Sequence, residues 1–155
     1  EEIQRMRDNG VYVAHCPQSN TNLSSGIAPV RTYLEQGIPT GLGTDVAGGA
    51  GESVFRAMAD AIQVSKLRWR LVDETCKPLT AEEAFYLGTK GGGGFFGKAG
   101  SFEEGYEFDA VVLNDQSLKH PQPLGVSLKE RLERFIYLSD ERHIDAKYVA
   151  GRKIF

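Results

Sequence analysis

Cysteine is scarce in this 155-residue chain, which contains only Cys16 and Cys76. The two lie far apart, and neither belongs to a CxxC pair. The sequence therefore excludes a disulfide-stapled scaffold and a cysteine-based zinc finger. Free thiols are typical of a reducing compartment, so the sequence predicts a cytoplasmic protein.

Long apolar runs and an excess of one charge are also missing. No stretch approaches the roughly 20 apolar residues that cross a bilayer, so we expect no membrane partner. The 18 basic and 21 acidic residues give a net charge of −3 and are mixed along the chain. A basic stripe that could follow a phosphate backbone is absent, which argues against nucleic-acid binding.

The first 45 residues repeat one pattern twice, a helix ended by glycine and then a buried strand. Residues 1–9 are the first predicted helix and residues 11–14 the first strand. The second copy has a helix from Pro29 to Gly37 and a strand over 38–43. This alternation of helices and strands is typical of a parallel α/β fold. The opening residues are typical of the interior of a helix, and we expect the chain to be part of a longer polypeptide.

The middle of the chain is predicted to be helical. One long helix covers 53–72, and Thr80 with Glu83 forms a capping box that opens a short helix ending in the glycine run 91–94. From about Gly100 the alternation of strand and helix stops, and a small β-rich unit is expected.

That C-terminal unit has a strand over 108–113 and then a loop containing Pro121 and Pro123. A second capping box at Ser127 opens another helix, and a hairpin over 148–155 closes the chain. The helices over 53–72 and behind Ser127 have apolar faces that we expect in the core: Phe55, Met58, Ala59, Ile62 and Trp69 in the first, Leu128, Leu132, Phe135 and Ile136 in the second.

Both predicted parallel strands run into polar residues, where α/β folds build their sites. The second strand leads to Asp45, whose carboxylate could bind a divalent metal or accept a proton from water, or only cap the turn. The first leads to His15, either a neutral imidazole in a pocket or a core histidine with satisfied hydrogen bonds. Cys16 cannot act with His15 as a nucleophile, because neighbours in a strand point to opposite faces. His120 and His143 have no visible partner among the loop and surface residues around them.

Several strings in the chain have a recognisable form: VAHCPQSN at 13–20, SGIAP at 25–29 and GLGTD at 41–45. In this order they resemble the amidohydrolase superfamily, in its branch of aminohydrolases that act on heterocycles. The continuation VAGG at 46–49 and the string FIYLSDER at 135–142 are similar to the members that deaminate guanine. The resemblance covers nearly the whole chain.

The resemblance implies the C-terminal part of a (β/α)8 metal-dependent hydrolase barrel and part of a small β-rich appended domain. Residues 1–99 would hold the last two βα units and the following helices, and residues 100–155 the return to the small domain. One catalytic metal, usually zinc, would activate the water that converts guanine to xanthine and ammonia. Asp45 would bind this metal and help to move the proton, and His15 would lie near the site.

The other metal ligands of the family, including its HxH pair, are absent from this sequence. Catalytic zinc needs three protein ligands, so we expect the isolated chain to be inactive. One alternative is an aminohydrolase acting on a different ring, and another is a non-catalytic fragment or binding module. Because a strip of barrel leaves apolar surface uncovered, we also expect homo-oligomers.

Overall fold

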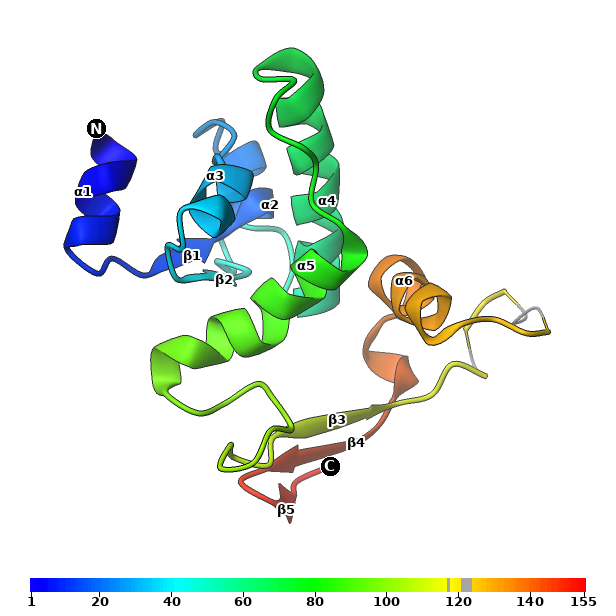
Figure 1. Ribbon diagram of the computed structural model, residues 1–155. Coiled ribbons are helices and arrows are strands. Elements are labelled where there is room, and N and C mark those ends of the chain that lie inside the picture. The colour runs from blue at the N-terminus through cyan, green and yellow to red at the C-terminus, as the bar shows by residue number, and fades with distance from the viewer. Residues whose placement is uncertain (117, 121–123) are drawn as a thin grey trace.

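The computed structural model describes residues 1–116, 118–120 and 124–155. Pro121 and Pro123 of the predicted loop therefore lie outside the described residues. Helices surround a two-stranded parallel sheet, and a three-stranded antiparallel sheet lies beside them near the C-terminus (Figure 1). The elements are α1 Glu2–Asp8, β1 Val13–His15, α2 Pro17–Asn22, α3 Val30–Glu35, β2 Thr40–Leu42, α4 Val54–Leu71, α5 Ala81–Tyr86, the π-helical turn η1 Leu87–Gly91, the 3-10 turn η2 Gly94–Phe96, β3 Ala110–Leu113, α6 Leu128–Leu138, the 3-10 turn η3 Glu141–His143, β4 Ile144–Val149 and β5 Arg152–Lys153.

The strands β1 and β2 pair in parallel, which confirms the predicted α/β arrangement. His15 stands opposite Leu42, and the amide of Gly43 extends the ladder by donating to the His15 carbonyl at 2.9 Å. Both strands therefore end at the same edge of the sheet. The helix α2 begins two residues after His15, so it starts at this edge as well.

Each of these strands begins two residues later than predicted, for one reason. Gly10 and Gly37 adopt φ angles of 61° and 69° directly after Asn9 and Gln36, the C-cap residues of α1 and α3. The following amides, of Val11 and Ile38, each donate at 2.9 Å to a carbonyl in the last turn of the preceding helix. This closes a Schellman motif at each helix end. Amides used in this way are not available to the sheet.

The glycine run 91–94 does not end a helix, contrary to the prediction. The helix continues from α5 through η1 to η2. A Cβ on Gly41 of β2 would lie 2.6 Å from the Cα of Gly92, and a Cβ on Gly91 would lie 2.7 Å from the carbonyl oxygen of Thr40. The glycines therefore let the helix touch the strand, because a residue without a Cβ permits a close backbone approach.

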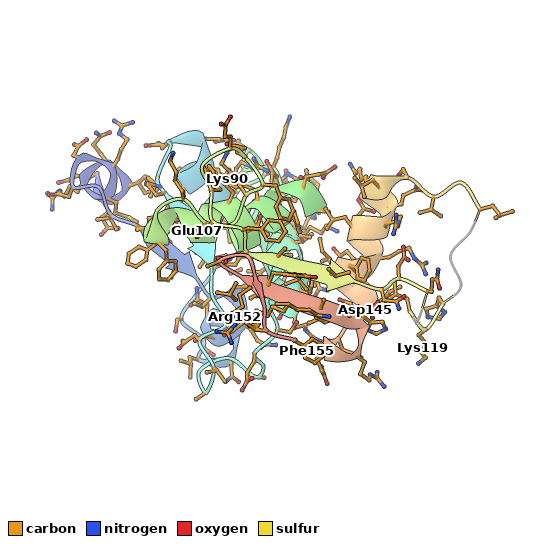
Figure 2. All side chains as sticks on the ribbon, turned by 90° about the horizontal axis from the view of Figure 1, so that it is seen from below. Lys90, Glu107, Lys119, Asp145, Arg152 and Phe155 are labelled. Carbon is orange, nitrogen blue, oxygen red and sulfur yellow. The ribbon has the colours of Figure 1, made fainter. Side chains whose placement is uncertain are left out.

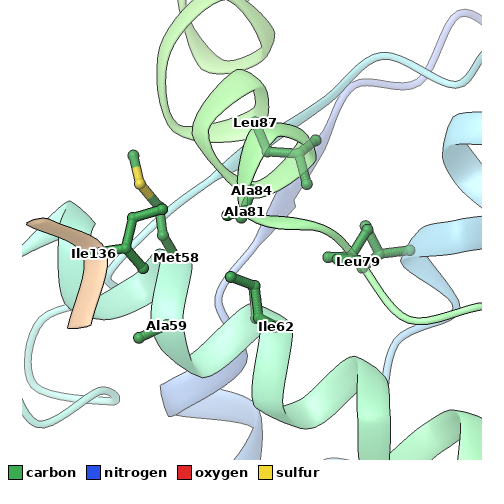
Figure 3. Packing of buried hydrophobic residues seen from close by; sticks show 10 residues of the cluster. Met58, Ala59, Ile62, Leu79, Ala81, Ala84, Leu87 and Ile136 are labelled. Carbon is green, nitrogen blue, oxygen red and sulfur yellow. The ribbon is translucent and has the colours of Figure 1, made fainter. Parts of the chain in front are cut away.

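The core lies between α4, the helix formed by α5 and η1, and α6 (Figure 3). Leu87 is fully buried in it, together with residues that the apolar patterns predicted: Met58, Ala59, Ile62 and Ile136. Two predicted positions are wrong. Trp69 is half-exposed, and its indole donates to the Glu74 carbonyl at 2.9 Å. Leu128 is 79% exposed because it lies in the first turn of α6, ahead of the buried part of that helix.

The strands β3, β4 and β5 form an antiparallel sheet in that order, and Figure 2 shows β3 and β4 from below. The predicted closing hairpin is confirmed. Ala150 and Gly151, with φ angles of 47° and 77°, make the two-residue turn between β4 and β5. The strand β4 already begins at Ile144, before the predicted start of the hairpin. In the described residues, no helix has the length and apolarity required to cross a membrane.

Candidate functional site

Asp45 lies three residues beyond β2, in an exposed loop that runs to residue 50 and that we call the Asp45 loop. Its φ angle of 46° is in the left-handed region, where aspartate is more tolerated than most residues. The turn is closed by its main-chain carbonyl, which accepts from the amides of Gly48 at 2.9 Å and Gly49 at 2.5 Å. The carboxylate is therefore not needed to cap the turn and remains exposed to solvent.

Ser19 is the residue that contacts this carboxylate. Its hydroxyl donates to Oδ2 of Asp45 at 2.6 Å, and the serine itself is only 3% exposed. Ser19 lies in α2, which begins with Pro17 in its first turn, a position that proline favours. Ser19 belongs to the string VAHCPQSN at 13–20, but no role was predicted for it. Its place just past a strand end, among polar residues, was the available signal.

His15 is 3% exposed, and its Nδ1 has no hydrogen-bond partner within the described part of the chain. It is therefore not a core histidine with satisfied hydrogen bonds. Burial lowers the pKa of His15 to about 4, so the imidazole is neutral at neutral pH. No hydrogen bond or ion pair among the described residues joins His15 to Asp45. The structure thus places both near one sheet edge, without a direct hydrogen bond or ion pair between them in the described residues.

The remaining candidates have structural partners. Burial, followed by the charge of Asp45, raises the pKa of the Cys16 thiol, which disfavours the thiolate that a nucleophile requires. His143 is buried, contrary to its predicted surface position. Its Nδ1 accepts from the Asp140 amide at 3.0 Å and so completes the capping of η3. The His120 carbonyl accepts a hydrogen bond from Arg134.

The described residues hold no group of three His, Cys, Asp or Glu side chains that could bind a metal. Asp45 can supply one carboxylate ligand, because one of its oxygens is held by Ser19 and the side chain is open to solvent. Any metal bound here would need its other ligands from outside this chain.

The model of the amidohydrolase family matches residues 1–154, and the chain belongs to this family. Its fold is accordingly an α/β hydrolase fold. It is similar to guanine deaminase from Homo sapiens, with 39% identity over 164 aligned residues that cover 99% of this chain and 36% of the human protein.

Two solved structures extend the comparison. A guanine deaminase from C. acetobutylicum with guanine bound in its active site is 51% identical, with a TM-score of 0.92, and the match covers 99% of this chain and 36% of that one. An adenosine deaminase from Xanthomonas campestris with bound zinc is 29% identical, with a TM-score of 0.79, over 98% of this chain and 34% of that one. The chain thus spans about a third of the length of these relatives.

The packing of the Asp45 loop predicts a steric difference between two of its neighbouring glycines. A Cβ on Gly48 would lie 2.7 Å from Oδ2 of Asp45 and 2.8 Å from Oγ of Ser19, whereas a Cβ on Gly51 would meet nothing closer than 4.0 Å. Gly48→Ala should therefore lower the free energy of unfolding by about 1–3 kcal/mol. Gly51→Ala should change it by less than about 0.5 kcal/mol. Urea unfolding of both variants checks this, and equal midpoints would contradict the packing described.

The buried neutral His15 predicts a pH-dependent stability. Between about pH 4 and 6.5 the unfolded state binds a proton at His15 and the folded state does not, so stability falls as the pH is lowered through this window. His15→Gln removes the effect. The difference in unfolding free energy between wild type and His15→Gln should change by about 3 kcal/mol across the window. Urea titrations at several pH values measure it, and a constant difference would show that His15 binds its proton equally well in the folded and unfolded states.

Proposed function

We propose that this chain is the C-terminal part of a zinc-dependent guanine deaminase, which converts guanine to xanthine and ammonia. The observation that carries the proposal is the solvent-exposed carboxylate of Asp45, which Ser19 holds at the carboxyl end of a parallel strand. Guanine deaminases from a human and a bacterial source, at 39% and 51% identity over 99% of the chain, support the choice of substrate.

In this proposal β1 and β2 are the seventh and eighth strands of a (β/α)8 barrel. Their parallel pairing and the helices between them are what consecutive βα units require. Residues 1–99 then belong to the barrel and its following helices, and residues 100–155 return to a small β-rich domain. The change from a parallel to an antiparallel sheet supports this division.

The carboxylate of Asp45 fits a zinc site as one of several ligands, and the others would come from the rest of the protein. A bound zinc ion would supply Lewis-acid activation of the attacking water. The carboxylate of Asp45 would take up a proton from the attacking water and return it to the purine ring or to the leaving amine. The zinc in the Xanthomonas campestris relative supports this choice of metal.

His15 has a smaller proposed role in the wall of the site. Its neutral imidazole, whose Nδ1 has no partner in the described residues, can form a hydrogen bond with the substrate or with a residue from another part of the protein. Because His15 is not a proposed metal ligand, its loss should leave more zinc bound than the loss of Asp45.

Exposed aromatic side chains support a further packing partner, either the remaining barrel or another subunit. Phe95 is 64% exposed and Phe96 83% exposed, and Phe95 packs edge-on against both Tyr12 and Phe96, with ring centroids 5.3 Å and 5.2 Å apart. Apolar clusters of this kind are usually covered in the assembled protein. Homo-oligomerisation and a cytoplasmic location are part of the proposal.

One other substrate class has support, because the Xanthomonas campestris relative is an adenosine deaminase. Ammonia release from guanine and from adenosine by the full-length enzyme separates the two. We expect release from guanine. Release from adenosine alone would move the protein to the other substrate class, and release from neither would favour a non-catalytic binding module.

Asp45→Asn in the full-length enzyme tests the proposed proton transfer. The amide keeps the size and one oxygen of the side chain but removes the basic group, so turnover with guanine should fall roughly 100-fold or more. Zinc content should fall less, because the other ligands remain. Asp8→Asn is the matched control, since Asp8 lies on the exposed surface of α1, and it should retain wild-type turnover. A zinc-loaded Asp45→Asn enzyme with wild-type turnover would reduce Asp45 to a structural residue.

A further inference from the structure

The short helix α2 directs three polar side chains at the Asp45 loop. Ser19 donates to the Asp45 carboxylate at 2.6 Å, and the Nδ2 of Asn22 donates to the Gly48 carbonyl at 2.8 Å. Oε1 of Gln18 accepts from the amide of Ala50 at 2.9 Å. These three positions of α2 lie on one side of a helix by their spacing. Together they contact the beginning, the middle and the end of the loop.

The loop needs such support, because its backbone is unfavourable for the residues it contains. Asp45 and Ala47 have φ angles of 46° and 84°, a region that residues other than glycine rarely occupy. Such conformations persist only where the surroundings fix them, and they gather at functional sites. Among the described residues, the three side chains of α2 form hydrogen bonds to this loop from outside it.

We propose that Gln18, Ser19 and Asn22 are positioning residues that fix the carboxylate of Asp45 for the deamination reaction. The inference rests on the proposed function, since it concerns the same carboxylate. Ser19 orients the carboxylate directly, and Asn22 and Gln18 hold the main chain of the second half of the loop, at Gly48 and Ala50. We call this set the α2 clamp.

The position of α2 in the fold makes the clamp a rigid one. The helix begins two residues after β1 and packs against α4, which carries much of the buried core. The orientation of the Asp45 carboxylate is therefore tied to the core through Ser19. A hydrogen bond from a hydroxyl to a carboxylate is among the stronger ones in proteins, and small misplacements of a catalytic group have large effects on rate.

Ser19→Ala in the full-length enzyme is the first test, with Thr21→Ala as the matched control. Thr21 also carries a hydroxyl on α2, but it donates within the helix, to the Pro17 carbonyl at 2.9 Å. Ser19→Ala should lower kcat with guanine about 10-fold or more, with a smaller change in KM. Zinc content and melting temperature should stay close to wild type. Thr21→Ala should leave kcat unchanged.

Two outcomes would overturn the inference. The first is a Ser19→Ala enzyme with wild-type kcat. The second is a parallel loss of zinc and melting temperature with an unchanged kcat per bound zinc, because that pattern belongs to a purely structural serine. A drop in kcat per bound zinc in Ser19→Ala, absent from Thr21→Ala, supports the clamp.

The other two positions allow a comparison matched in charge. Asn22→Asp and Gln18→Glu each add one negative charge to α2. The first removes the donor that Gly48 requires, whereas the second keeps an acceptor for the amide of Ala50. Asn22→Asp should therefore lower kcat several-fold more than Gln18→Glu. Equal losses would show that charge, and not hydrogen bonding, is responsible, and would overturn this part of the clamp.

Amide hydrogen exchange separates failure of the clamp from failure of the proposed function. A wild-type enzyme that releases no ammonia from guanine would refute the function but leave the contacts of α2 open to measurement. In metal-free protein, Ser19→Ala should speed exchange of the Gly48 and Gly49 amides about 10-fold or more, while Thr21→Ala should not. Unchanged exchange in Ser19→Ala would refute the clamp whatever the substrate is.

Discussion

The parallel pairing of β1 with β2 determines where His15, Ser19 and Asp45 lie. The register that sets His15 opposite Leu42 brings the ends of both strands to one edge of the sheet. From that edge one chain segment continues into α2 and the other into the Asp45 loop. Ser19 and Asp45 are 26 positions apart in sequence, yet a hydrogen bond of 2.6 Å joins them. A slip in this register would remove that contact and the site with it.

Behind the strands, the structure is tightly packed. Glycines on both sides let β2 and the π-helical turn η1 approach until their backbones touch, and Leu87 of that turn is fully buried against α4. At the C-terminal end of β2, the Asp45 loop is exposed and strained. A tightly packed core that supports a strained, accessible loop is the arrangement expected where a carboxylate must be held in one orientation. The α2 clamp links the two.

Much of the fold could be predicted from the sequence because its signals are local. Capping boxes at Thr80 and Ser127 begin their helices as predicted, and Gly151 marks the closing hairpin. The predicted start of β1 was wrong because the amide of Val11 can bond either to the preceding helix end or to a neighbouring strand. The local sequence pattern does not distinguish these two possibilities, and in the structure the amide bonds to the helix end. The prediction that the helix ends in the glycine run 91–94 was wrong for a similar reason, since glycine both ends helices and permits close packing.

The candidate site was less predictable than the fold. Asp45 and His15 were indicated by their places after strands, and the family resemblance strengthened Asp45. The contact of Ser19 with Asp45 could not be predicted, because it depends on the tertiary placement of α2 beside the loop. That the buried Nδ1 of His15 finds no partner among the described residues likewise depends on tertiary packing, which the sequence pattern does not specify.

The location of zinc in crystals of the full-length enzyme, determined by anomalous diffraction at the zinc edge, tests the central claim most directly. We expect one zinc ion in contact with a carboxylate oxygen of Asp45, with the hydroxyl of Ser19 still bonded to that carboxylate. A zinc ion bound elsewhere in the barrel, with no contact to Asp45, would contradict it.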